Sequence, residues 1–183
     1  MLNKAQPWAA KLIYIVGCDH AMQVEPRAFE DNLECQRAHY EKELKALASY
    51  YRFTLYCEEI KHTAYSIAED FAIRRRKRYV NIDFPAELRC PFGIPNDYAA
   101  SLKPALYTPE QIGSWHRIRE DFMFHRATAR MRSPEVVALV ICGDDHRSPL
   151  KRRFERNIGC LVEDRSFLKE KWYDPRQHTY DDL

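Results

Sequence analysis

The sequence lacks any long hydrophobic run, because no apolar stretch approaches the roughly 20 residues needed to span a bilayer. Its opening, MLNKAQPWAAKLIYIVG, does not follow the plan of a secretory signal peptide. It also has no Walker phosphate loop and no complete G-x-G-x-x-G fingerprint, which argues against a phosphate-loop NTPase and a Rossmann dehydrogenase. We therefore expect a cytoplasmic protein with no membrane partner.

Strong net charge is missing as well, since 29 basic and 27 acidic residues leave +2. The whole-chain charge therefore gives no sign of a nucleic-acid partner, and we do not expect one. The run RRRKR (74–78) is typical either of a nucleic-acid patch or of a solvated helix C-terminus, and the second is favoured. No pair of the six cysteines has C-x-x-C spacing, so buried thiols are favoured over a disulfide or zinc framework.

The sequence does contain enough apolar residues to form a sizeable core. With 183 residues, 45% of them hydrophobic and 31% charged, it predicts one globular α/β domain over 1–183. Residues 85–109 hold five prolines and predict a long irregular excursion that serves as a lid. The tail 166–183 is charged and aromatic, and its pattern predicts no particular element.

Hydrophobic periodicity predicts strands and helices in alternation along the chain. The expected strands are 12–16, 53–59, 78–84, 136–142 and 160–164, and the expected helices are 27–51, 63–77, 109–131 and 149–157. This alternation predicts a three-layer α/β/α fold with a mainly parallel sheet of about five strands. The simplest winding gives the strand order 3-2-1-4-5.

Two of these strands end in the same motif, Gly-x-x-His. LIYIVGCDHAMQ (12–23) and VVALVICGDDHR (136–147) each run from apolar residues to a glycine and then a histidine. Neighbouring parallel strands align their carboxyl ends, where open α/β sheets bind ligands. His20 and His146 are therefore expected to face one crevice.

The acidic pair Glu58 and Glu59 ends the strand between them in sequence. Two imidazoles and a carboxylate can hold a divalent Mn, Co or Zn ion and lower the pKa of its bound water toward ~7. We take His20, Glu59 and His146 as candidate metal ligands. The alternative is structural: the glycines make tight turns and the histidines cap backbone groups.

Further residues near this edge are candidates for acid–base work or substrate binding. Glu58, Glu59 and His62 are candidate catalytic groups, although His62 is equally consistent with a helix start. Asp19 and Asp145 add carboxylates that we assign to substrate binding. The remaining helix histidines, His39, His116 and His125, have the pattern of ordinary helix residues.

Two arginines interrupt the apolar face of the helix expected at 109–131. Trp115, Ile118 and Phe122 define that face, yet Arg119 and Arg126 fall within it. The arginines either bind an anionic group of the substrate or form structural ion pairs with acidic neighbours. A third possibility is that the aliphatic parts of these side chains cover apolar surface while their guanidinium groups reach solvent.

The order of these motifs resembles the Tiki and TraB group, with its erythromycin-esterase-like and ChaN-like relatives. The resemblance rests on the early Gly-x-x-His, on the glutamate at the end of the next strand, and on the late segment ICGDDHRSPLKRRFERNIGCLV. The GCDH opening is also similar to that of small bacterial proteins with the pattern GxDH. Members of the group with known activity are hydrolases, and Tiki-type proteins are metal-dependent proteases. The resemblance implies metal ligands at His20, Glu58 or Glu59, and His146.

Together these patterns predict a metal-dependent hydrolase of a small, anionic substrate that uses a metal-bound water. The alternative is a regulatory module that binds a metabolite or nucleotide at the same rim without chemistry. An interaction protein with an aromatic docking surface is permitted by the composition but not favoured. Metal content separates the first hypothesis from the other two.

Overall fold

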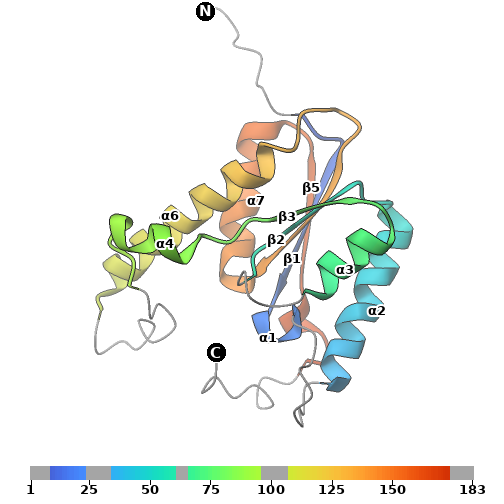
Figure 1. The fold of residues 1–183 in the computed structure, drawn as a ribbon, viewed down its shortest axis with the longest axis horizontal. Helices are drawn as coiled ribbons and strands as arrows, with labels where there is room; N and C mark the ends of the chain where they lie inside the picture. The colour runs from blue at the N-terminus through green and yellow to red at the C-terminus, as the bar shows by residue number, and fades with distance from the viewer. Residues whose placement is uncertain (1–8, 24–33, 61–65, 96–106, 174–183) are drawn as a thin grey trace, which may run out of the picture.

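The computed structural model describes residues 9–23, 34–60, 66–95 and 107–173, and its centre is a parallel sheet (Figure 1). The strands are β1 (Leu12–Cys18), β2 (Leu55–Glu58), β3 (Arg78–Asn81), β4 (Val137–Gly143) and β5 (Leu161–Ser166). Every strand pairs in parallel with its neighbours. The predicted α/β class with a five-stranded parallel sheet is confirmed.

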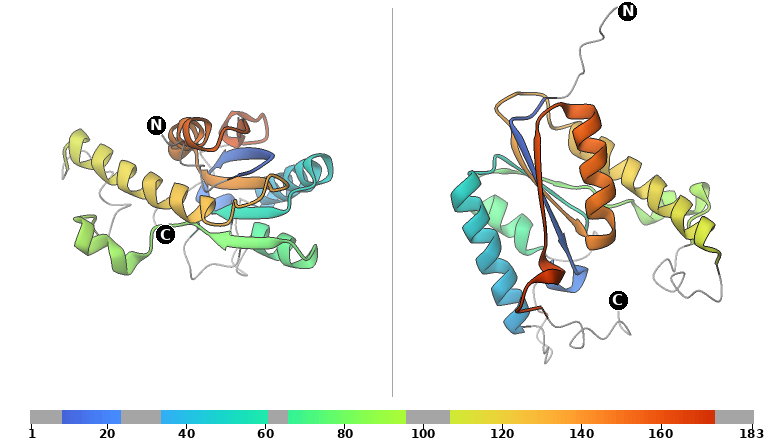
Figure 2. Two further views of the ribbon diagram at one scale, coloured as in Figure 1. Left: turned by 90° about the horizontal axis from the view of Figure 1, so that it is seen from above. Right: turned by 180° about the vertical axis from the view of Figure 1, so that it is seen from behind.

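Helices cover both faces of the sheet, as Figure 2 shows from above and from behind. They are α1 (His20–Gln23), α2 (Glu34–Tyr51), α3 (Ile67–Arg74), α4 (Ala86–Arg89), α6 (Pro109–Thr128) and α7 (Asp144–Ile158). The described residues also contain two short 3-10 turns, η1 (Cys90–Phe92) and η2 (Phe167–Lys169). The core on one face comes from α2 and α3, and the core on the other from α6 and α7.

The strand order is β3-β2-β4-β1-β5, so the predicted order 3-2-1-4-5 is wrong in the position of β4. The chain returns from β3 along α6 and places β4 between β2 and β1. The reason is burial: residues 138–142 of β4 are completely inaccessible to solvent, which suits a strand flanked on both sides. As a result, β4 touches both β1 and β2, and the carboxyl ends of all three strands meet.

Alternate residues of the central strands enter opposite cores. In β1, Ile13 and Ile15 pack toward α6 and α7, whereas Tyr14 and Val16 pack toward α2 and α3. All six cysteines are free in this structure, and Cys18, Cys57 and Cys142 are buried.

Local signals explain where the two helices of the site begin. Thr108 caps α6: its hydroxyl accepts a hydrogen bond from Gln111 N, and the Gln111 side chain accepts one from Thr108 N. By contrast, α7 begins at Asp144 rather than at 149, so the predicted start is wrong. Asp144 and Asp145 favour the positive end of a helix, and Pro149 lies inside α7. His146 is therefore on the first turn of a helix.

The described part of the 85–109 excursion forms only short helical pieces, as predicted. It packs against α6 through a small cluster that includes Phe84, Ile94 and Trp115. Residues 96–106 of the expected lid and residues 174–183 of the tail lie outside the described residues. Among the helices that are described, none combines the length and hydropathy needed to cross a membrane.

Candidate metal centre

Three predicted ligands meet at the carboxyl edge of the sheet. Glu59 follows β2, and its Oε2 accepts a hydrogen bond of 2.9 Å from Gly143 N at the end of β4. His20 Nε2 lies 3.9 Å from Glu59 Oε2, and His146 Nε2 lies 3.6 Å from Glu59 Oε1. Because β4 is central, it brings together residues that follow three different strands.

The two motif glycines leave room for different neighbours. A Cβ at Gly143 would stand 3.1 Å from His20 Nε2 and 3.7 Å from Glu59 Oε2, so this glycine keeps space for the site. A Cβ at Gly17 would stand 2.1 Å from Asp144 Oδ1 and 3.0 Å from its Cα, so this glycine lets α7 begin beside β1. The glycine therefore serves packing in the first copy of the motif and leaves space for the site in the second, whereas both histidines lie at the site.

Arg119 is a buried partner of this carboxylate cluster. Its Nη2 donates to Glu59 Oε1 at 2.5 Å and to Asp83 Oδ1 at 3.3 Å, and only 8% of the residue is exposed. Burial alone would raise the pKa of Glu59, but His146, Arg119, His20 and the Gly143 N–H together lower it to about 2. Of the alternatives that the sequence left open for Arg119, the geometry is that of the structural ion pair.

Glu58 supports His20 indirectly, through Gln23. Ser66 Oγ, Tyr79 OH and Gln23 Nε2 all donate to the Glu58 carboxylate, which is fully buried. Gln23 Oε1 in turn accepts a 2.6 Å hydrogen bond from His20 Nδ1. Burial raises the pKa of Glu58 to about 7 despite these three donors. Glu58 thus holds Gln23, which fixes the orientation of the His20 ring.

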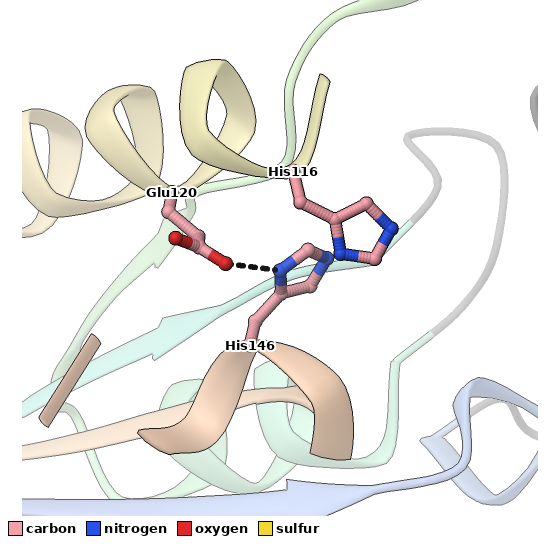
Figure 3. Close-up of side chains that lie close together, drawn as sticks. All are labelled: His116, Glu120 and His146. Carbon is pink, nitrogen blue, oxygen red and sulfur yellow. Dashed lines mark hydrogen bonds and ion pairs between the residues drawn. The ribbon is translucent and has the colours of Figure 1, made fainter. Parts of the chain in front are cut away.

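On its other side, His146 faces two residues of α6 (Figure 3). His146 Nδ1 lies 3.3 Å from Glu120 Oε1, and its ring centroid is 4.9 Å from that of His116. One ligand atom each from His116, Glu120 and His146 lies within 4.8 Å of the others. These three side chains could hold a metal ion, with both acidic and imidazole donors present.

The charges around this group differ between its two histidines. Burial lowers the pKa of His116, and the charges of His146 and Arg119 add to that effect. Burial alone would also lower the pKa of His146, but Glu59 and Glu120 raise it above its ordinary value. The second oxygen of Glu120 lies 3.6 Å from Arg153 Nη2, which leaves Oε1 facing His146.

Three other predicted site residues have different surroundings. Arg126 is exposed, with its guanidinium 5.9 Å from the centre of the Phe122 ring. Asp145 is exposed on α7, and Asp19 is buried with its Oδ2 accepting a 3.3 Å hydrogen bond from Tyr173 OH. His62 lies outside the described residues.

Sequence reasoning missed His116 and Glu120 because it treated His116 as an ordinary helix residue. The available signal was their spacing: residues four apart on a helix share one face, and His-x-x-x-Glu puts two metal-binding groups there. Searches against protein-family models, curated proteins and solved structures found no match.

Proposed function

We propose that this protein is a metal-dependent hydrolase of a small substrate, with His116, Glu120 and His146 holding the ion. The convergence of these three side chains from α6 and α7 is the observation that carries the proposal. The resemblance to the Tiki and TraB group, whose characterised members are hydrolases, leads to the same expectation. A divalent ion held by three protein ligands supplies a position for water and lowers the pKa of that water toward ~7.

The donor set fits a transition metal better than calcium or magnesium. Two imidazoles with one carboxylate suit Zn, Co or Mn, whereas Ca²⁺ and Mg²⁺ prefer sites made of oxygen ligands. His146 Nδ1 and Glu120 Oε1 are 3.3 Å apart, which is about the separation of two ligands that are each ~2 Å from one tetrahedral ion.

Glu59 then has an orienting role rather than that of a ligand. Histidines that bind metals commonly direct their second ring nitrogen to a carboxylate, which fixes the tautomer and the ring orientation. Glu59 Oε1 lies 3.6 Å from His146 Nε2, and Arg119 and Gly143 hold this carboxylate in place. Arg119 is already engaged, so the proposal does not require an anionic substrate.

His20 is the candidate for proton transfer at the rim. Its side chain is 45% exposed, unlike those of Glu59 and His146, and Gln23 fixes its Nδ1. A partly exposed imidazole that keeps one orientation can exchange protons with both solvent and a substrate.

Calorimetric titration with Zn²⁺, Co²⁺ and Mn²⁺ tests the metal site. We expect tight binding of one ion per chain, and a loss of about 100-fold or more in affinity for His146→Ala and Glu120→Ala. His125→Ala is the matched control, because His125 is on the same helix and exposed. The proposal is wrong if the wild type binds none of the three ions, or if all variants bind them equally.

A screen of ester, amide, phosphate and glycosidic substrates with the metal-loaded protein tests the hydrolase assignment. We expect turnover of at least one class, which disappears in His146→Ala and persists in His125→Ala. Metal binding at this site without turnover of any class would reject the hydrolase and favour a ligand-binding module.

A further inference from the structure

Basic residues gather at the amino edge of the sheet, opposite the candidate metal centre. Arg52 precedes β2 and Lys77 directly precedes β3, whose first residue is Arg78. Arg130 and Arg132 precede β4. All five side chains are exposed. Since β3, β2 and β4 are adjacent strands about 4.8 Å apart, these cations lie within a short stretch of the edge.

These cations line two hollows. One, of about 410 Å³, is lined by Arg78, Ala129, Arg130 and Arg132. The other, of about 400 Å³, is lined by Ala48, Ser49, Arg52, Phe53, Tyr56, Arg75 and Lys77. No acidic side chain is among the described residues that line either hollow. Each hollow therefore presents three cations and, among its described lining residues, no carboxylate.

The hollows lie on opposite sides of the amino end of β3. Lys77 and Arg78 are consecutive, and successive residues of extended chain direct their side chains to opposite faces. Lys77 lines the hollow beside α2, whereas Arg78 lines the hollow beside the end of α6. An occupant of both hollows must bend around the end of this edge strand.

Helix dipoles do not account for all of these cations. Basic residues favour the negative C-terminal ends of helices, and Arg74 and Arg126 lie in the last turns of α3 and α6. That effect is confined to about one turn. Lys77, Arg78 and Arg132 lie beyond that turn. Arg132 Nε donates to Ala129 O at 3.1 Å and Arg78 Nη1 donates to Arg130 O at 3.5 Å, so each of these contacts uses one nitrogen of a guanidinium group.

We propose that the amino edge binds single-stranded nucleic acid through its phosphates. Guanidinium groups match phosphate oxygens bidentately, and five of the six cations in the hollows are arginines. One free phosphate occupies one hollow, whereas a chain of phosphates occupies both. Duplex DNA is stiff over ~150 base pairs and does not turn around a strand end, whereas a single strand does.

Fluorescence anisotropy with a labelled oligothymidylate measures this binding in the full chain. We expect binding whose log Kd depends linearly on log salt concentration. The double variant Arg130→Ala/Arg132→Ala should weaken binding about tenfold at low salt and reduce the slope by about 1.4, or ~0.7 for each phosphate that is no longer neutralised. Arg152→Ala/Arg156→Ala, on the exposed side of α7, changes the charge equally and should leave the affinity within about twofold.

Competitors identify the source of the phosphate. Duplex DNA, inorganic phosphate and vesicles of phosphatidylserine and phosphatidylcholine should each displace the oligonucleotide poorly. The proposal is overturned if the oligonucleotide fails to bind, if both double variants weaken binding equally, or if duplex or vesicles bind more tightly than the single strand. These outcomes are independent of the metal site, because the hollows share no residue with it.

Discussion

The charged residues at the carboxyl and amino edges of the same sheet differ in how they are paired and how deeply they are buried. At the carboxyl edge, Glu59 and Glu120 are 1% and 5% exposed and each has a cationic partner. At the amino edge, Arg78, Arg130 and Arg132 are exposed around a hollow without an acidic lining residue. A net charge of +2 therefore conceals a region of buried, paired charges at one edge and a region of exposed cations at the other.

The largest effect is expected where charges are buried in pairs. Arg119→Ala leaves Glu59 and Asp83 without their shared cation, and breaking a buried pair costs about 3–5 kcal/mol. Arg126→Ala, seven residues along the same helix, should change the free energy of unfolding by less than about 0.5 kcal/mol. Urea denaturation compares them, and equal losses would show that Arg119 is not a structural ion-pair partner.

The pH dependence of stability tests the burial of Glu58. Its pKa is about 7 in the fold against 4.5 ordinarily, so the folded state holds the proton more tightly than the unfolded chain does. Protonated Glu58 therefore stabilises the fold by about 3 kcal/mol, and this stabilisation is fully present below pH 4.5. It is lost as the pH rises through 7. Glu58→Gln should remove this slope from unfolding curves recorded between pH 4 and 8. The exposed Glu155→Gln should keep it, and an unchanged slope in Glu58→Gln would contradict the assignment.

The two motif glycines offer a smaller, sharper test. Gly17→Ala places a Cβ 3.0 Å from the Asp144 backbone, and overpacking of this kind costs about 1–3 kcal/mol. Gly143→Ala meets the end of the His20 side chain, which is partly exposed and can move, so its cost should be lower. Thermal unfolding ranks the two variants, and the reverse ranking would show that the roles of the glycines are exchanged.

The smallest effect on stability is expected at the amino edge. Arg130→Ala/Arg132→Ala removes exposed charges, so the unfolding free energy should stay within about 0.5 kcal/mol while oligonucleotide affinity falls. Circular dichroism melts check this. A large destabilisation would mean that these arginines hold the loop before β4 rather than a ligand.

The sequence predicts the strands and the shared motif well because both depend on local patterns. Apolar runs that lead into Gly-x-x-His locate the ends of β1 and β4, and the pair Glu58 and Glu59 marks the end of β2. The position of β4 is not a local property. It depends on the crossover through α6, and the simplest winding placed β4 outside β1 instead of between β1 and β2.

The missed half of the site has a similar cause. The apolar residues of α6 face two partners: Met123 and Ala127 pack toward the sheet, whereas Ile118 and Phe122 pack against the segment around Phe84. A single apolar face predicted from all of these residues points between the two partners and matches neither of them. The buried residues of α6 include Arg119, which the sequence pattern treats as an interruption, and Glu120, which it does not single out.

The most direct test of the account is a crystal structure of the zinc-loaded protein, with anomalous diffraction recorded at the zinc edge. The account predicts one strong anomalous peak between His116, Glu120 and His146, about 2.0–2.2 Å from a donor atom of each. A peak between His20 and Glu59 instead, or no peak within reach of His146, would contradict it.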